Sequence, residues 1–320
     1  MTSKFKFLTA SLALSVAALV SVASAADAPD TTHTGRSSVY GNLKNASLEA
    51  VSTPSQMLSL IKAPDSAAPT AIWTMLEHGE RVECLDCVPY VSKMLYASNP
   101  KTREISAWWL RRRIFGVFGT GEVYEQTINT VNNPKASELS RAYAANALGE
   151  FLEGAGIEPV SQALLNDASP LVRLAATNAL IRLNSQGKIS GKSDEYPLAS
   201  ALSDPDEQVR LAALNGATHI NVFSNIDRVV NLISDPSPLV RRRAAQTLGT
   251  FRNVDAVVGL IALTSPTNES DAGVRAAAVW ALGQIRDPES LDAALAAVLA
   301  AQNDTDSSVR DAAHISARRL

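Results

Sequence analysis

Two cysteines are the residues of this chain whose spacing most directly suggests chemistry. Cys84 and Cys87 stand in the run Cys-Leu-Asp-Cys and are the only cysteines among the 320 residues. Pro89 and the periodic apolar run after it predict that the pair begins a helix, where the helix dipole stabilises thiolates. Three interpretations stay open: a structural disulfide, a redox-sensing or exchanging pair, and a metal ligand pair or intermolecular bridge.

Other reactive sites have little support in the sequence. A zinc site needs four ligands, and only His78 and a few acids lie near the cysteines. Thioether haem attachment needs a histidine directly after the second cysteine, where Val88 stands. Di-iron hydroxylases built from helical repeats use His-Glu dipeptides, and no histidine here precedes a glutamate. The sequence therefore predicts no metal, no cofactor and no enzyme. A thiol-redox protein or a maturation factor for a cofactor protein, using Cys84 and Cys87, is the alternative.

A second concentration of chemically distinctive residues lies between residues 73 and 124. Eight of the fifteen aromatic residues that follow residue 25 fall in this segment, beside a run of three arginines. One interpretation is a bulky packed cap with a basic edge. The other is a partner-binding surface, because Trp and Arg dominate binding hot spots. The residues of that surface would be Trp108, Trp109, Arg111, Arg112 and Arg113.

A third pattern is a row of amides, Asn146, Asn178, Asn215 and Gln246, at equivalent positions of successive units. Side-chain amides can pair with both the N–H and the C=O of an extended peptide. A solvated face without a ligand is the other interpretation.

An internal repeat must position all of these residues. A small or β-branched residue followed by arginine recurs at intervals of 31 to 38 residues, the length of one helix pair. Its arginines are Arg103, Arg141, Arg173, Arg210, Arg241, Arg275 and Arg310. Six residues before an arginine stands an acid: Asp167, Asp204, Asp235, Glu269 or Asp304. Because proline follows two of these acids, we expect the acids to cap the helices.

The residues after each arginine predict one buried helix face. Alanine recurs three positions on and leucine seven positions on, which places both on one stripe of a helix. Gly149, Gly249 and Gly283 stand eight positions on and are expected to end their helices. Stacked helix pairs of this kind form an all-α solenoid.

The Asp, Val-Arg, Ala and Ala-Leu-Gly pattern of residues 99–320 resembles the HEAT-repeat family, in particular its short bacterial form named after phycobilisome-lyase-like proteins. The resemblance implies an α-solenoid whose surface binds protein partners. It also implies that aspartate and arginine bridge successive repeats.

Three shorter segments precede the repeats. Lys4 and Lys6, an apolar run and Ala23-Ser24-Ala25 predict a cleaved signal peptide over residues 1–25. Residues 26–52 are polar and aperiodic, which predicts a flexible tether, and residues 53–98 hold capping helices with the two cysteines. We therefore expect export to the periplasm or cell envelope, with membrane contact only through the signal peptide.

Charge and composition limit the partner. The formal net charge is −3, and it becomes −5 without residues 1–25, which hold two lysines and no acids. Nucleic-acid binding needs a basic surface, so we expect a protein partner instead. The predicted function is a non-enzymatic scaffold or adaptor that binds through residues 73–124.

Overall fold

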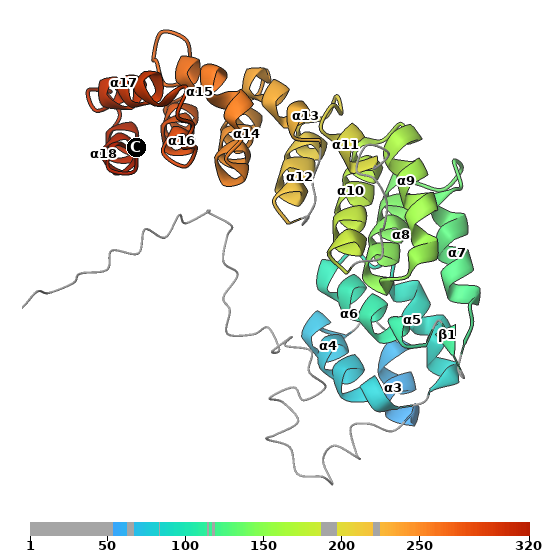
Figure 1. Cartoon of the computed structure of the whole chain (residues 1–320). Helices are drawn as coiled ribbons and strands as arrows, with labels where there is room; N and C mark the ends of the chain where they lie inside the picture. Colours follow the sequence, from blue (N-terminus) through green and yellow to red (C-terminus); the bar gives the residue numbers. More distant parts are fainter. Residues whose placement is uncertain are drawn as a thin grey trace, which may run out of the picture. The chain divides into compact units, whose positions relative to one another are not determined.

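A computed structural model describes residues 54–62, 67–82, 84–113, 115–116, 119–186, 197–219 and 225–320. These residues belong to one compact unit, residues 51–320, which is a stack of helices (Figure 1). The predicted signal peptide and the predicted tether lie outside the described residues. No described helix has the length and apolar character that crossing a membrane requires.

The repeats consist of alternating first and second helices, as the sequence predicts. The first helices are α6 (Pro100–Arg111), α8 (Glu138–Phe151), α10 (Pro170–Ser185), α12 (Glu207–Ala217), α14 (Pro238–Phe251), α16 (Ala272–Leu282) and α18 (Ser307–Ala317). The second helices are α7 (Glu122–Val131), α9 (Ile157–Asn166), α11 (Pro197–Ala201), α13 (Ile226–Asn231), α15 (Val257–Leu263) and α17 (Leu291–Ala301). Three of the second helices adjoin 3₁₀ turns: η4 (Gly154–Gly156), η6 (Leu232–Ser234) and η7 (Val254–Ala256).

Short helices precede the repeats. They are α3 (Pro54–Ile61), α4 (Pro69–His78) and α5 (Val88–Met94), with the 3₁₀ turns η2 (Gly79–Arg81) and η3 (Leu85–Cys87). Both α4 and α5 contact α6, so the apolar core of this cap continues into the first repeat. A hairpin of β1 (Phe115–Gly116) and β2 (Gly119–Thr120) links α6 to α7, a short strand pair that the all-α prediction did not include.

The buried stripe explains why the helices stack in order. Each first helix packs against the next first helix, and each second helix packs against the first helix that follows it (Figure 1). The alanines three residues after the repeat arginines, Ala144, Ala176, Ala213, Ala244, Ala278 and Ala313, are all 0 % exposed. Small side chains at these positions let neighbouring helices approach closely, which confirms the predicted face.

The glycines have a different role from the predicted one. Gly149 and Gly249 lie inside α8 and α14, and the left-handed C-cap residues are Leu152 and Arg252. A Cβ atom on Gly149 would lie 2.7 Å from the Cα of Ala179 on α10. The helix-ending interpretation is therefore wrong for these two glycines, which instead let the next first helix approach. Gly283 is the C-cap of α16, as predicted.

The N-caps also differ from the prediction. The residue that caps α12 is Asp206, whose side chain accepts hydrogen bonds from Gln208 N and Val209 N. The predicted cap Asp204 stands two residues earlier and accepts instead from the N–H of Asp206 at 2.8 Å. The same N–H contact is made by Asp167, Asp235, Glu269 and Asp304. Because these acids precede the N-cap residue, their carboxylates can also contact a neighbouring repeat.

Candidate functional site

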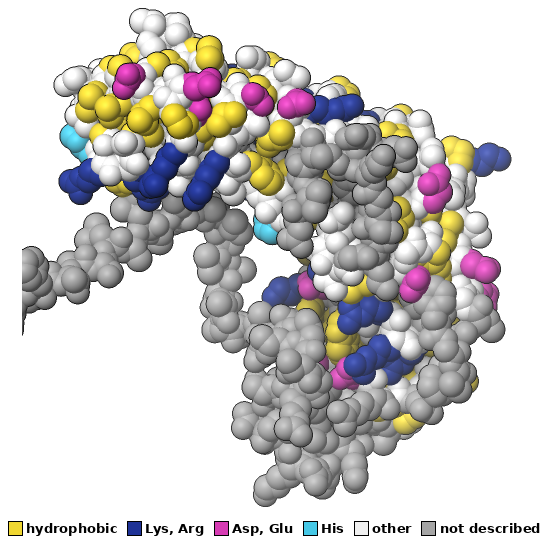
Figure 2. Space-filling view, in the orientation of Figure 1, with side chains coloured by type: hydrophobic (Ala, Val, Ile, Leu, Met, Phe, Trp, Pro, Cys, Tyr) yellow, Lys and Arg dark blue, Asp and Glu magenta, His cyan; other side chains and the backbone are white. Residues whose placement is uncertain are grey.

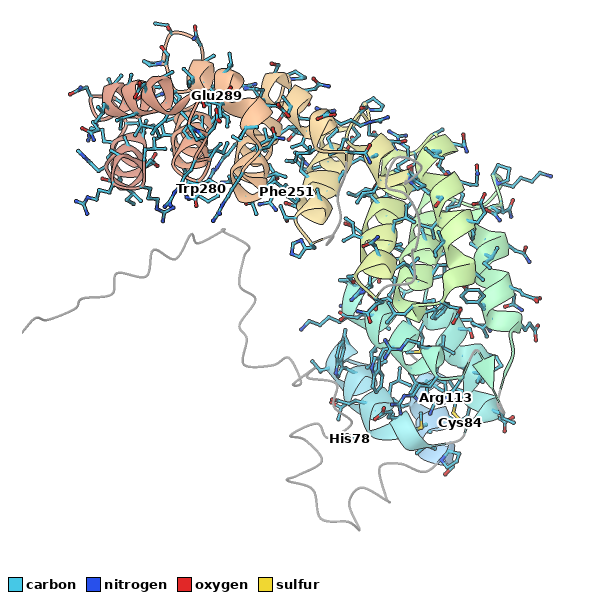
Figure 3. All side chains as sticks on the ribbon, in the orientation of Figure 1. His78, Cys84, Arg113, Phe251, Trp280 and Glu289 are labelled. Carbon is cyan, nitrogen blue, oxygen red and sulfur yellow. A yellow bond between two sulfur atoms is a disulfide. The ribbon has the colours of Figure 1, made fainter. Side chains whose placement is uncertain are left out.

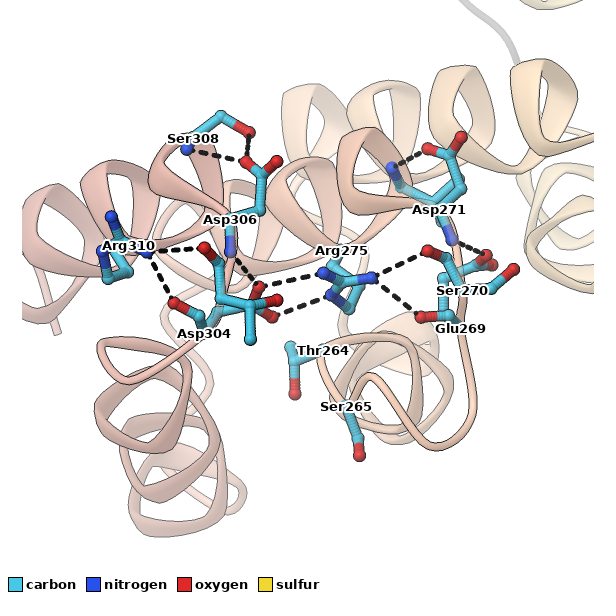
Figure 4. Close-up of polar contacts among 12 residues, drawn as sticks. Thr264, Ser265, Glu269, Ser270, Asp271, Arg275, Asp304, Asp306, Ser308 and Arg310 are labelled. Atoms are coloured by element: carbon cyan, nitrogen blue, oxygen red, sulfur yellow. Dashed lines mark hydrogen bonds and ion pairs between the residues drawn. The ribbon is translucent and has the colours of Figure 1, made fainter.

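An arginine–carboxylate ladder joins successive repeats. Five of the arginines that open a first helix donate from Nε and Nη2 to both oxygens of the next repeat's acid, as Arg275 does to Asp304 at 2.8 and 2.9 Å (Figure 4). The other pairs are Arg141–Asp167, Arg173–Asp204, Arg210–Asp235 and Arg241–Glu269. This two-point geometry is the strong form of the ion pair. The bridging of successive repeats is therefore present.

Within one repeat, the acid and the arginine six residues after it are linked through main-chain carbonyls. The third nitrogen of each arginine, Nη1, donates to main-chain carbonyls that precede its own helix, as Arg210 does to Asp204 O at 2.8 Å. The carboxylate of Asp204 binds Arg173 of the preceding repeat instead. Arg210 and Asp204 are thus joined through main chain, and their side chains pair with residues of different repeats.

The ladder ends differently at the two ends of the array. Nη1 of Arg310 donates to the carbonyls of Asp304 and Thr305 (Figure 4). Arg103 has Lys135 where the next repeat would supply its acid, and its guanidinium lies 3.9 Å from the centre of the Tyr143 ring. Stacking on the aromatic face replaces the missing carboxylate.

The two cysteines form a disulfide in the cap (Figure 3). Their Cα atoms are 5.2 Å apart, and the residues are 5 % (Cys84) and 0 % (Cys87) exposed. Cys84 is the N-cap of the turn η3 and Cys87 is the N-cap of α5, so the pair begins a helical segment as predicted. Little sulfur surface is left for an attacking thiolate, so the geometry favours the structural interpretation.

Two residues of the predicted partner surface belong to the core of the cap. Trp109 is 1 % exposed and its Nε1 donates to Gly79 O at 3.1 Å. The Arg113 guanidinium stacks on the Trp109 ring at 3.7 Å and donates to the carbonyls of Trp109, Gly79, Glu80 and Val82. Because both side chains are buried in the folded cap, the prediction that they contact a partner is wrong.

The other three residues of that prediction lie nearer the surface. Trp108 and Arg111 are half-buried, and Arg112 is exposed and pairs with Glu80 at 2.6 Å. Their role in binding stays a prediction. The aromatic residue Tyr124, at the end of the same segment, is buried; burial raises its pKa to about 12, and Glu153 adds to the effect. Much of the aromatic content of residues 73–124 therefore serves packing.

Three of the four amides in the row line a groove. A hollow of about 570 Å³ lies between α10, α12 and α14, and its lining includes Asn178, Asn215 and Gln246. Asn178 and Asn215 are exposed, and Gln246 is half-buried. The fourth amide, Asn146, lines a smaller hollow of about 280 Å³ between α6, α8 and α10, beside the Arg182–Glu150 ion pair. The row is thus divided between two hollows.

Helix spacing explains why the larger groove lies where it does. Where glycine stands eight positions after the repeat arginine, as Gly149 does, the next helix approaches closely. The equivalent residues of α10 and α12 are Ile181 and Thr218. Ile181 points at Gly216, where a Cβ would lie 2.5 Å from the isoleucine side chain. Consequently α12 packs more loosely against α10 and α14 than the neighbouring first helices do against one another.

The groove combines amides, apolar side chains and positive charge. Besides the amides, its lining includes Leu174, Leu211 and Leu239. It also includes Arg242, Arg243 and His219, which the sequence analysis did not single out. The signal was present, because Arg241-Arg242-Arg243 replaces the single arginine of the other repeats. Burial lowers the pKa of Arg243, which donates from Nη2 to Thr218 Oγ1 at 3.3 Å.

The arrangement is suited to binding. The described residues hold no group of three His, Cys, Asp or Glu side chains placed to share a metal ion. The groove offers hydrogen-bonding amides, an apolar floor and guanidinium groups. These are the features of a binding site for an extended chain.

Two family models match the repeats. Residues 195–270 match the model of HEAT repeats, and residues 274–304 match that of the PBS lyase HEAT-like repeat. No curated protein sequence matches the chain.

Solved structures show the same kind of fold. The chain is similar to YibA of Escherichia coli, with a TM-score of 0.50 and 18 % identity over 89 % of this chain and 98 % of YibA. It is also similar to Kap121p bound to Nup53p and bound to Pho4p, with TM-scores of 0.50 and 0.51 and identities of 15 % and 14 %. Each covers 84 % of this chain, which spans 34 % of Kap121p. At these identities the likeness is one of fold.

Proposed function

This chain is a HEAT-repeat protein, and from that premise we propose that it is a non-enzymatic scaffold that holds another protein in the groove between α10, α12 and α14. The observation that carries the proposal is the meeting of Asn178, Asn215 and Gln246 in one hollow of about 570 Å³. Kap121p, a HEAT-like relative in fold, is seen with bound proteins, which supports a holding role for such a stack.

The proposed main surface for contact with the partner is this groove and not residues 73–124. Trp109 and Arg113 are committed to the cap, whereas Asn178 and Asn215 are exposed. Amides at repeat spacing can follow an extended main chain, because each amide both donates and accepts. The buried disulfide gives no comparable support to the thiol-redox alternative.

Site-specific photocrosslinking tests the groove. A photoreactive residue at Asn215 should crosslink a partner in envelope extract, and the same residue at Val258 should not. Val258 is the matched control because it is 80 % exposed on α15, a second helix outside the groove.

A variant supplies the second arm of that test. Asn178→Ala combined with Asn215→Ala should weaken capture of the crosslinked partner at least about tenfold, as loss of interface hot spots does. The melting temperature should stay unchanged, because both side chains are exposed. Equal crosslinking from positions 215 and 258, or full capture by the double variant, would refute the proposal.

We further propose that the scaffold works in the periplasm or cell envelope. Lys4, Lys6, the apolar run and Ala23-Ser24-Ala25 support export. Intact-mass analysis of the protein recovered from the envelope should show a chain that begins near Ala26. Recovery of a chain that retains residues 1–25 in the cytoplasm would contradict this part.

A further inference from the structure

The groove contains an arginine, Arg243, that forms no ion pair with any described carboxylate, unlike the ladder arginines. The ladder arginines each bind both oxygens of an acid. Arg243, two residues after Arg241 on the same helix, has a buried Nε with no hydrogen-bond partner among the described residues. Among the described residues, its only hydrogen bond goes from Nη2 to the neutral hydroxyl of Thr218. Burial lowers its pKa.

The surroundings of Arg243 are basic or neutral. The described residues that line the groove include Arg242 and His219 and no Asp or Glu. In Figure 2, Lys and Arg side chains gather along the lower edge of the C-terminal helices, whereas Asp and Glu side chains lie in a band above them. A desolvated guanidinium without a counter-charge is costly, so a ligand that brings an anionic group is favoured there.

We propose that the groove between α10, α12 and α14 binds an extended acidic segment of the partner protein, with a carboxylate of that segment on Arg243 and Arg242. This inference rests on the proposed function and adds the chemistry of the partner. The side-chain amides of Asn178, Asn215 and Gln246 pair with the segment's main chain. Leu174 and Leu211 contact its carbon atoms.

A nucleic acid fits this groove less well. Strands of DNA or RNA are bound by long basic tracks and by aromatic rings that stack on bases. The groove lining contains no Trp, Tyr or Phe among the described residues, and the chain carries a net charge of −3. Guanidinium groups confined to one end of an amide row suit a peptide with a few carboxylates.

The length of the segment follows from the helices it crosses. Packed neighbouring helices lie roughly 10 Å apart, so α10, α12 and α14 span roughly 20 Å. An extended peptide advances about 3.4 Å per residue and crosses this distance with about six residues. Probes of about eight residues therefore cover the groove.

Fluorescence anisotropy with synthetic peptides tests the inference on the full chain. The probes are labelled alternating Gly–Glu, Gly–Gln and Gly–Lys peptides of about eight residues, and a labelled oligothymidylate. The Gly–Glu peptide should bind at least about tenfold more tightly than the Gly–Gln peptide, the discrimination expected of one charge-assisted hydrogen bond. Raising ionic strength should weaken it, because exposed charge pairs are screened.

Substitutions test whether Arg242 and Arg243 bind the acidic peptide. Arg242→Gln combined with Arg243→Gln should remove at least about nine-tenths of the Gly–Glu affinity. Arg318→Gln combined with Arg319→Gln, at two exposed arginines that follow α18, removes the same two charges and should leave that affinity unchanged. Circular dichroism checks that the double variant is folded. The comparison of peptides on the wild-type chain decides the question even if the variant unfolds.

The other outcomes overturn the inference. Equal binding of Gly–Glu and Gly–Gln peptides, preference for Gly–Lys, or no binding of any probe would exclude an acidic segment. Tighter binding of oligothymidylate that depends on Arg242 and Arg243 would indicate nucleic acid instead. Crosslinking from position 215 that persists in any of these cases would leave the scaffold proposal standing while the acidic partner is rejected.

Discussion

At the residue scale, arginine has three roles that depend on its neighbours. In the ladder its guanidinium binds a carboxylate of the next repeat, as Arg275 binds Asp304. In the cap Arg113 binds main-chain carbonyls and the face of Trp109. In the groove, Nε of Arg243 has neither kind of partner among the described residues. The first two roles stabilise the fold, whereas the third leaves binding capacity unused.

Arg113 and its neighbour Arg112 give a matched pair for the cap. We expect Arg113→Ala to lower the free energy of unfolding by about 3 kcal/mol, because several buried carbonyls lose a charged donor. Arg112→Ala should cost less than about 1 kcal/mol, because its ion pair with Glu80 is at the surface. Urea titration followed by circular dichroism measures both. Similar losses for the two variants would show that Arg113 is not part of the cap core.

At the element scale, the residue eight positions after the repeat arginine controls helix spacing. Gly149, Gly249 and Gly283 all lie against a small residue of the next first helix. Ile181 stands at the same position in α10, before the looser junction that forms the groove. The side chain at this position thus differs between the close helix contacts and the looser one.

Gly249→Ala tests this control. An added Cβ would lie 2.7 Å from a ring carbon of Trp280 and 2.8 Å from the Cα of Ala281, so α16 would have to move. Overpacking of this kind costs about 1–3 kcal/mol. The control is Gly154→Ala, where no atom lies within 4 Å of the added Cβ. Thermal melts should show a lower midpoint for the first variant only, and equal midpoints would remove the proposed cause of helix spacing.

At the scale of the whole molecule, stability passes from repeat to repeat. Each repeat contacts its neighbours, and ladder pairs link successive repeats from Arg141 to Asp304. Loss of one pair should therefore weaken the repeats beside it first, since solenoid stability is a sum of local terms. The terminal pair, Arg275–Asp304, is the most sensitive place to observe this.

Asp304→Asn should destabilise α17 and α18 by about 3 kcal/mol at neutral pH, because Arg275 loses its buried counter-charge. Hydrogen exchange should rise in α17 and α18 and stay unchanged in α8 and α10. A uniform rise across all of these helices would contradict the local-stability argument.

The same pair also predicts a pH dependence. Hydrogen bonds from Arg275 lower the pKa of Asp304 below its usual 3.8. A lowered folded-state pKa gives stability that is present above pH about 4 and is lost as pH falls through the folded pKa. The wild-type chain should therefore lose more stability in α17 and α18 on acidification than the Asp304→Asn variant, as hydrogen exchange at acid pH can measure.

The sequence by itself determined the architecture, because its signals are local and periodic. Arginine, alanine and leucine at fixed offsets place one apolar stripe on each first helix, and six of the predicted alanines are fully buried. A helix stripe depends only on residues within a few turns, so it can be read from the chain. The interval of 31 to 38 residues likewise determined that helix pairs stack in sequence order.

Only the tertiary structure decided which side chains remain available to a partner. Trp109 and Arg113 look like a binding pair in sequence, yet they close on the carbonyls of Gly79 and Glu80 some 30 residues away. Arg242 and Arg243 look like a variation of the repeat, yet they face a groove. Exposure depends on the spacing between helices of different repeats. That spacing is set by contacts such as Ile181 against Gly216, which residues distant in sequence make only after the helices have packed.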